Sequence, residues 1–480
     1  MTFSLPDLLI GLVDADAIEA VNVNAVNCNS REIKQGEAFF ALPGLSAHGD
    51  AYCAQAVKNG AVVIISDREV VPCPGVGVVV VQDVRKAYAQ AAAKTCGKQP
   101  QNLIGVTGTS GKTSVVSFIE QIWAANDILG ASIGTLGVSV GDKKVGGALT
   151  TPDSLSLHKS LALLKSGGCN HVALEASSHG LDQRRLDGLK FNAVGFTNLS
   201  RDHLDYHADE DEYREAKLRL FRDLLAGDGY AVVNSDDPEH MPFMFAALDS
   251  GATLLTIGEE GAFFEISEVK IEGFGQRVTG KMVGEPVSFL LPLVGHFQVD
   301  NAVMALALST QVGADPEKSV QALNHLKGAK GRLEHVGEKN GAAIFVDYAH
   351  KPAALELALE ALRPYVKNEL IVVFGAGGDR DKGKRPMMGE IAARLADKVI
   401  ITDDNPRTEN ASNIRKEIMQ SAKGAKEIAG REDAIKAAIA DLKEGDVLLI
   451  AGKGHEEYQI IGTKKLKFSD HNVVKSAIEA

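Results

Sequence analysis

Short apolar runs alternate with polar, glycine-rich segments along most of the chain. Uninterrupted runs of four to six apolar residues predict strands that are buried on both faces, as in a parallel sheet. In the first half of the chain these runs are residues 61–65, 78–81, 103–106, 171–174 and 193–196. In the second half, strand-like segments near 342–347, 370–374, 398–402 and 446–451 alternate with helical patterns such as 353–362 and 391–395. This alternation predicts an α/β fold that ends in a doubly wound sheet.

The length and two polar interruptions predict three domains. A chain of 480 residues is long enough for about three domains of ordinary size. Polar residues at 97–102 precede a strand, and a Gly/Lys-rich stretch at 327–331 precedes the doubly wound part. We therefore expect a small N-terminal α/β domain at 1–97, a central domain at 98–330 and a C-terminal domain at 331–480.

Composition narrows the classes of partner. The net charge of −12 provides no general attraction for nucleic acids or anionic membranes, so neither is expected as a partner. No apolar run approaches the roughly 20 residues that span a bilayer, and the first residues lack a signal-peptide pattern. The five cysteines form no C-x-x-C pair, which favours a reducing compartment. We expect a cytoplasmic protein without membrane insertion.

The strongest local motif is the segment from Thr107 to Thr113, with the sequence TGTSGKT. It stands between a predicted strand and a predicted helix, which is the context of a phosphate-binding loop. Its glycines let backbone N–H groups approach phosphate oxygens, Lys112 can reach the terminal phosphates, and the Thr113 hydroxyl can bind Mg²⁺. Nucleotide binding is therefore favoured over an ordinary glycine-rich turn, although Val106 occupies the first glycine position of the strict motif.

Two further groups can contribute to metal binding beside this loop. Glu175 follows the strand 171–174, and His203 follows the segment 196–199. Both are thus expected near the carboxyl ends of neighbouring strands. A carboxylate is a usual Mg²⁺ ligand, whereas histidine is a less common one and is more often structural. Lys217 lies in a helical stretch and by its spacing alone would be a surface lysine.

Four strand-ending segments of the C-terminal part carry polar residues: 346–350, 375–380, 404–407 and 451–456. In a parallel sheet these segments meet at one edge, where α/β proteins bind ligands. Arg380 and Arg407 can bind a carboxylate through two parallel hydrogen bonds, and Glu456 can bind an ammonium group. Such a set suits a zwitterionic amino acid.

Taken together, several motifs resemble the Mur ligase family. They are the segments 107–113, 175–181, 198–203, 295–301, 331–334 and 347–350. The resemblance covers nearly the whole chain, and Asp404-Asn405-Pro406-Arg407 is similar to the signature of the members that add meso-2,6-diaminopimelate. It implies a UDP-sugar-binding N-terminal domain, a central P-loop ATPase domain and a C-terminal Rossmann-like domain that receives the amino acid.

The resemblance also implies roles for individual residues. The implied nucleotide-binding residues are Gly108, Thr109, Ser110, Gly111, Lys112, Thr113, Ser114, Asn301 and Arg332. Ser30, Leu45, Ser46 and Ala47 would contact the uridine end, and Thr150, Thr151, Ser177, Gln183 and Arg185 would hold the muramoyl dipeptide. Arg380, Asp404, Asn405, Pro406, Arg407, Gly452 and Glu456 would bind the amino acid. Lys112, Glu175, His203 and Lys217 would be catalytic, with Lys217 carboxylated to a carbamate that binds Mg²⁺ together with Thr113, Glu175 and His203.

The activity implied is an ATP-dependent ligation, with ATP and Mg²⁺ as cofactors. It joins meso-2,6-diaminopimelate to UDP-N-acetylmuramoyl-L-Ala-D-Glu through an acyl phosphate, in peptidoglycan synthesis. We expect a monomer. The alternatives are the same reaction with L-lysine or another amino acid, a P-loop kinase that stops at a phosphorylated product, and a non-catalytic nucleotide-binding regulator.

Overall fold

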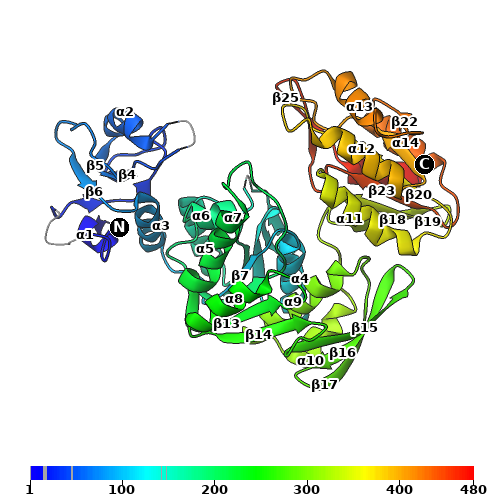
Figure 1. Cartoon of the computed structure of the whole chain (residues 1–480). Coiled ribbons are helices and arrows are strands. Elements are labelled where there is room, and N and C mark those ends of the chain that lie inside the picture. The colour runs from blue at the N-terminus through cyan, green and yellow to red at the C-terminus, as the bar shows by residue number, and fades with distance from the viewer. Residues whose placement is uncertain (1, 14–18, 45–46, 142, 148) are drawn as a thin grey trace. The chain divides into compact units, whose positions relative to one another are not determined.

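The structure, a computed structural model shown in Figure 1, describes residues 2–13, 19–44, 47–141, 143–147 and 149–480. The chain divides into two compact units, of which the first comprises residues 1–265 and 303–319 and the second residues 266–302 and 320–480. The helices α9 (Phe297–Gln311) and α10 (Pro316–Leu323) each pass from one unit into the other. Within the described residues, no helix combines the length and the apolar character that a membrane span requires.

The first unit begins with a small parallel sheet. Its strands, in spatial order, are β3 (Val26–Asn27), β4 (Glu37–Phe40), β5 (Ala61–Ser66) and β6 (Gly77–Val80). The other elements are the paired strands β1 (Phe3–Ser4) and β2 (Asn22–Val23) and the helices α1 (Leu5–Leu8), α2 (Cys53–Lys58) and α3 (Val84–Thr95). Because β5 has helices on both faces, its apolar residues are buried on both sides, as the continuous run predicts. Asp83 caps the start of α3, because its carboxylate accepts a hydrogen bond from Lys86 N at 2.9 Å.

A larger sheet forms the rest of the first unit. In spatial order its strands are β10 (Lys143–Val145), β9 (Gly137–Val140), β8 (Gly130–Gly134), β11 (His171–Glu175), β7 (Asn102–Thr107), β12 (Phe191–Phe196), β13 (Leu225–Asn234) and β14 (Thr253–Gly258), and β14 pairs with the start of β15 (Phe264–Glu272). The strands β8, β11, β7, β12, β13 and β14 run parallel. The loops after β7, β11 and β12 therefore meet at one edge.

Helices cover both faces of this sheet (Figure 1). They are α4 (Lys112–Ala125), α5 (Ser154–Ser166), α6 (Ser178–Asp182), α7 (Glu210–Arg219), which continues in a π-helical turn over Leu220–Leu224, and α8 (His240–Asp249). A Cβ at Gly105 would lie 2.9 Å from Leu220, and one at Gly195 would lie 2.9 Å from Leu308 of α9. Gly105 pairs with Val194, the neighbour of Gly195, so the two glycines face opposite sides. Both strands thus leave room for closely packed helices.

The second unit contains the doubly wound sheet. Its strands, in spatial order, are β18 (Glu334–Lys339), β19 (Ala342–Asp347), β23 (Val447–Ala451), β20 (Leu370–Phe374), β21 (Lys398–Ile401) and β22 (Lys426–Glu427). All neighbours are parallel except β18 and β19. Two hairpins complete the strands: β16 (Gly275–Met282) with β17 (Glu285–Leu291), and β24 (Tyr458–Ile461) with β25 (Lys464–Lys467).

Alternate residues of this sheet enter two separate apolar cores. Ala343 and Phe345 of β19 pack with α11 (Pro352–Leu362), α12 (Lys384–Leu395) and α13 (Ala411–Met419). Ile344 and Val346 pack with α14 (Arg431–Ala440) and α15 (Asp470–Glu479) on the other face. The predicted α/β class, with a doubly wound sheet near the C-terminus, is confirmed.

Candidate functional site

The predicted phosphate loop connects β7 to the first turn of α4. Gly108 has φ +145° and Gly111 has φ +88°, which are backbone conformations that residues with a side chain rarely adopt. A Cβ at Gly108 would also lie 1.9 Å from Thr197 Oγ1. The side chains of Thr113 and Ser114 are buried at the start of the helix. Glycine is therefore required here for both conformation and space, as a loop that wraps a phosphate demands.

Lys112 lies folded back over this loop. Its ammonium group donates hydrogen bonds to the carbonyls of Gly108 and Thr109 at 2.7 and 2.9 Å. The lysine thus places its positive charge beside the loop. The ammonium group and the loop N–H groups could there bind the terminal phosphates of a nucleotide together.

The segment after β12 braces the loop from the other side. Asn198 O accepts a hydrogen bond from Thr109 N at 2.8 Å, and Asn198 Oδ1 accepts one from Ser110 N at 2.9 Å. The Thr109 hydroxyl contacts Tyr213 Oη at 3.1 Å and receives a hydrogen bond from Ser200 N at 3.0 Å. Asn198 lies in the segment 198–203 that carries the family resemblance, but neither Asn198 nor Tyr213 was among the predicted site residues.

Lys217 is one of the most deeply buried lysines of the chain. Its side chain is 1% exposed, and its ammonium donates to Gly108 O at 2.8 Å and lies 4.3 Å from the centre of the Tyr213 ring. Burial lowers the pKa of Lys217 well below its usual value, and the positive charge of Lys112 adds to this effect. The surface position that the spacing alone suggested for Lys217 is therefore wrong. The neutral amine that this environment favours is the form that reacts with CO₂.

Glu175 and His203 differ in their surroundings. Glu175 is buried, and its carboxylate accepts hydrogen bonds from Thr135 N at 2.8 Å and Thr135 Oγ1 at 3.1 Å. His203 has φ +55°, and its side chain is 41% exposed, with Nε2 3.6 Å from a carboxylate oxygen of Asp202. Across the residues that the structure describes, no three His, Cys, Asp or Glu side chains form a metal-ligand group. Mg²⁺ in nucleotide sites is commonly held by one or two protein oxygens together with water and substrate phosphates, and Glu175 and Thr113 could supply such oxygens.

The five residues implied for the muramoyl dipeptide form one hydrogen-bonded cluster beside Glu175. Thr151 Oγ1 donates to Glu175 O at 2.7 Å and contacts Ser177 Oγ at 3.0 Å, while Thr150 Oγ1 contacts Thr135 Oγ1 at 3.0 Å. Arg185 donates to Thr151 O at 2.7 Å and to Gln183 Oε1 at 2.8 Å. The pKa of the Arg185 guanidinium is lowered by burial, so the charge is poorly solvated and would gain from an anionic ligand.

The residues implied for the uridine end lie in the N-terminal sheet region. Ser30 is buried, and its carbonyl accepts a hydrogen bond from Asn59 Nδ2 at 2.8 Å. Ala47 is exposed and accepts a hydrogen bond from Gly44 N at 3.1 Å. Leu45 and Ser46 lie outside the described residues.

In the second unit, Arg332 and Asn301 have contrasting surroundings. The Arg332 guanidinium lies 4.8 Å from the centre of the Tyr348 ring, and its buried Nε has no hydrogen-bond partner among the described atoms. Asn301 is buried and donates to Gln298 Oε1 at 3.0 Å. Arg332 thus has donor capacity to spare for a ligand.

The residues implied for the amino acid come together at the carboxyl ends of β21, β20 and β23. Arg407 has φ +51° and donates to Gly378 O at 2.7 Å, which fixes its guanidinium beside the loop after β20. Asn405 Nδ2 donates to Glu456 Oε2 at 2.9 Å. Gly452 has φ +114°, and a Cβ there would lie 2.8 Å from Asp404 Oδ2. Arg380 is exposed on the loop after β20, and Pro406 is buried.

Two buried cations that the predicted set does not include hold these loops together. Lys453, with a fully buried side chain, donates to Asn405 Oδ1 at 3.0 Å and Glu456 Oε2 at 3.1 Å. Arg385, also fully buried, binds Glu409 at 3.0 Å and Glu417 at 2.8 Å. Lys453 lies in a segment that the sequence marked as a ligand-binding loop, but burial of a lysine has no signature in a single sequence.

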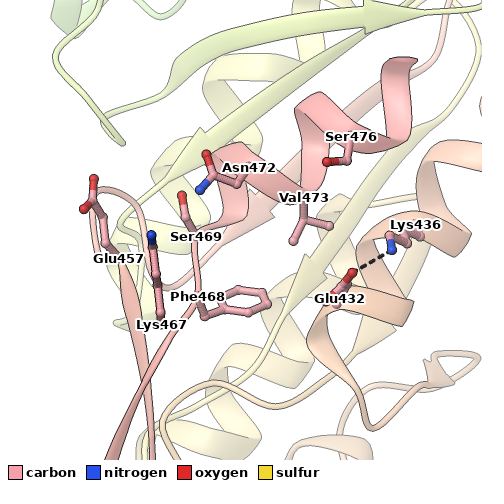
Figure 2. A pocket seen from close by; sticks show the side chains of 9 residues that line it. All are labelled: Glu432, Lys436, Glu457, Lys467, Phe468, Ser469, Asn472, Val473 and Ser476. Atoms are coloured by element: carbon pink, nitrogen blue, oxygen red, sulfur yellow. Dashed lines mark hydrogen bonds and ion pairs between the residues drawn. The ribbon is translucent and has the colours of Figure 1, made fainter. Parts of the chain in front are cut away.

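A pocket of about 460 Å³ lies elsewhere in the second unit, between α14, β25 and α15 (Figure 2). Its rim includes the ion pair of Glu432 and Lys436, whose charged atoms are 2.6 Å apart. None of the predicted site residues lines it.

Comparisons with known proteins find relatives that cover nearly the whole chain. Three family models match: "Mur ligase family, catalytic domain" over residues 22–95, "Mur ligase middle domain" over 106–309 and "Mur ligase, glutamate ligase domain" over 331–454. A curated protein of Bradyrhizobium diazoefficiens named UDP-N-acetylmuramoyl-L-alanyl-D-glutamate–2,6-diaminopimelate ligase is 50% identical over 466 residues, which are 96% of each chain. A protein of Chelativorans sp. with the same name is 50% identical over 458 residues, 95% of each chain.

A solved structure of an enzyme with this name is also similar. It is 33% identical, covers 100% of this chain and 99% of its own, and superposes with a TM-score of 0.74. The expected three-domain α/β architecture is thereby confirmed. The domain boundaries at 97/98 and 330/331 stay predictions.

Proposed function

Because the chain belongs to the Mur ligase family, and so is an ATP-dependent ligase that forms amide bonds, we propose the following reaction for it. The protein joins meso-2,6-diaminopimelate to the γ-carboxylate of D-glutamate in UDP-N-acetylmuramoyl-L-Ala-D-Glu, in peptidoglycan synthesis. Relatives 50% identical over nearly the entire chain carry the name of this reaction. We further propose that the protein acts as a monomer in the cytoplasm.

The observation that carries the choice of amino acid is that Arg407 and Glu456 lie on two loops that the hydrogen bond from Asn405 to Glu456 joins. A guanidinium binds a carboxylate and a carboxylate binds an ammonium group. Together they suit the amino-acid group at the far end of diaminopimelate. Lysine has an ammonium but no carboxylate there, so it would leave the Arg407 charge without a partner.

The reaction has two steps. A γ-carboxylate oxygen of the dipeptide attacks the γ-phosphorus of ATP, the bond to the ADP oxygen breaks, and an acyl phosphate forms. The diaminopimelate amine then attacks the acyl carbon, phosphate leaves, and the amine loses a proton. Activation is needed because a carboxylate is a poor electrophile. Lys112 and the N–H groups of the 108–113 loop would stabilise the charge on the transferred phosphoryl group.

Thr113, Glu175, His203 and a carbamate on Lys217 would hold Mg²⁺, which supplies charge neutralisation at the phosphates when bound. The burial of Lys217 and the lowered pKa of its amine support this assignment. An unmodified Lys217 ammonium would lie beside the same loop as the Lys112 ammonium, so two like charges would be close together. A carbamate would reverse the sign of one of them.

The remaining assignments follow the clusters described above. Thr150, Thr151, Ser177, Gln183 and Arg185 would hold the muramoyl dipeptide, and Ser30 with residues 45–47 would contact the uridine. Asn301 and Arg332 would contact ATP.

The test is ADP release by the purified protein with ATP, Mg²⁺ and the UDP-linked dipeptide, with a panel of added amino acids and mass measurement of the product. We expect release to depend on meso-2,6-diaminopimelate and the product to be the tripeptide. Equal turnover of lysine would contradict the proposed specificity. ADP release without any amine would favour a kinase, and ATP binding without turnover would favour a regulator.

A further inference from the structure

The Lys453 side chain is a fully buried cation in the middle of the amino-acid site. Its ammonium group has three donors and three acceptors within reach: Asn405 Oδ1 at 3.0 Å, Glu456 Oε2 at 3.1 Å and Asp404 Oδ1 at 3.4 Å. No part of its side chain is exposed. A lysine whose donors are all used inside the protein has none left for a ligand. Lys453 must therefore act through the side chains that it contacts.

The orientation of Asn405 follows from these contacts. Its Oδ1 accepts from Ile460 N at 2.9 Å as well as from Lys453, and both are obligatory donors. Its Nδ2 therefore faces Glu456 Oε2, 2.9 Å away. Lys453 and Asn405 together occupy Oε2 of Glu456, so Oε1 is the carboxylate oxygen that stays available to an incoming ammonium group.

The charges of the three side chains lead to the same assignment. Asp404 and Glu456 carry one negative charge each, and their side chains are 7% and 17% exposed. Lys453 balances one of these charges. The buried Arg431, which also lies near both carboxylates, is already paired with Asp470 at 2.8 Å. Lys384 also interacts with Asp404, although its ammonium group donates its hydrogen bond to His350 O at 2.7 Å. Glu456 shares Lys453 with Asp404, so its carboxylate can still be neutralised by one ammonium group of the substrate.

We propose that Lys453 is a positioning residue for amino-acid selection. It neutralises one of the two carboxylates and orients Glu456 so that a single carboxylate oxygen receives the far-end ammonium of the diamino acid. The inference rests on the proposed function, because that function supplies the ammonium.

The test compares Lys453→Met with the parent protein and with Lys436→Met, a matched control on a partly exposed lysine paired with Glu432. In Lys453→Met we expect the KM for diaminopimelate to rise about 30-fold or more. The KM values for ATP and the UDP-linked dipeptide should stay within about twofold of the parent's, and the control should match the parent throughout.

A double-mutant cycle with Glu456→Gln separates positioning from a structural role. If Lys453 acts through Glu456, the two effects on the KM for diaminopimelate are less than additive in the double variant. Additive effects, or equal changes in all three KM values, would overturn the proposal. Should Lys453→Met fail to fold, Lys453→Gln takes its place, because it keeps two N–H donors without the charge. It must show the same selective rise in the KM for diaminopimelate.

The failure of this inference can be distinguished from the failure of the proposed function. A parent protein that makes no tripeptide would contradict the proposed function. An active parent together with Lys453 variants whose KM values are unchanged would contradict this inference alone.

Discussion

Arg407 combines a constrained backbone with a guanidinium only partly occupied by the protein. Its φ of +51° is unusual for a residue with a side chain, and one nitrogen donates to Gly378 O at 2.7 Å. Backbone bonds to Ile460 O at 3.1 Å and from Gly462 N at 2.7 Å hold this conformation. Strain retained at one position by several bonds is typical of a ligand-binding residue.

We therefore expect Arg407→Ala to raise the KM for diaminopimelate by about 100-fold, with little change in the KM for ATP. Arg407→Lys should restore little, because an ammonium cannot form two parallel hydrogen bonds to a carboxylate. Steady-state ADP release measures both constants. The control is Arg363→Ala, which removes a half-exposed arginine paired with Asp397 in the same unit. Turnover of diaminopimelate by Arg407→Ala at the parent's efficiency would show the assignment to be wrong.

The protonation of His158 makes the stability of the first unit depend on pH. It lies fully buried on α5, and burial lowers its pKa to about 4 from 6.5. Between these values the unfolded chain binds a proton that the folded chain does not. Stability is therefore full above pH 6.5 and declines as the pH falls toward 4. From pH 7 to pH 5 this residue alone should remove about 2 kcal/mol of unfolding free energy.

His158→Phe should abolish this part of the pH dependence of the unfolding free energy. The control His325→Gln, at an exposed position, should retain it. The measurement is urea unfolding followed by fluorescence of Trp123, the one tryptophan of the chain, which is fully buried in the same unit. Equal slopes against pH for the parent and His158→Phe would contradict the assignment.

The catalytic and ligand-binding residues differ in how far a sequence can predict them. The Arg407 loop follows a predicted strand, so motif position indicated where it lies, whereas the grouping of Thr151, Ser177 and Arg185 was implied only by the family resemblance. The hydrogen bonds of Asn198 and the burial of Lys453 come from contacts between segments distant along the chain. Spacing along the chain carries no signal for such contacts. The buried state of Lys217 was likewise invisible to its helical pattern.

At the scale of elements, strands were predicted well because a strand buried on both faces requires a continuous apolar run. The runs at 61–65, 171–174 and 193–196 all lie within strands. Irregular helix was not predicted: the α7 segment continues as a π-helical turn over Leu220–Leu224. That turn packs Leu220 against the space left by Gly105, so tertiary packing rather than local propensity accounts for it.

The turn between β7 and α4 provides the sharpest test at this scale. Gly108→Ala would introduce a Cβ where φ is +145° and Thr197 Oγ1 is 1.9 Å away. We expect the loop to shift and nucleotide affinity to fall by about 100-fold or more, because the N–H groups would no longer converge. Titration with a fluorescent ADP analogue measures this. Gly146→Ala, which meets nothing within 4 Å, should bind as the parent does. Normal binding by Gly108→Ala would contradict the role of this turn.

At the scale of the whole molecule, the residues proposed for phosphoryl transfer lie mostly in one unit and those proposed for amino-acid binding in the other. Asn301 and Arg332, which are proposed to contact ATP, are the exceptions, because they belong to the second unit. The phosphate loop, Glu175 and Lys217 belong to the first unit, whereas Arg407, Lys453 and Glu456 belong to the second. Binding of the two anionic substrates by a chain of net charge −12 then depends on local cations such as Lys112 and Arg185. The partly buried positions of these cations could be found only in the folded chain.

This division predicts that acyl phosphate formation and amide formation can be separated by single substitutions. Hydroxylamine captures an acyl phosphate as a hydroxamate without using the diaminopimelate site. In Arg407→Ala we expect hydroxamate formation within about threefold of the parent, while tripeptide formation at low diaminopimelate falls about 100-fold. Lys112→Ala should lose both products, because its ammonium stabilises the phosphoryl transfer that precedes either of them. Loss of hydroxamate in Arg407→Ala would mean that the amino-acid site also controls the first step, and the proposed separation of the two steps would then be wrong.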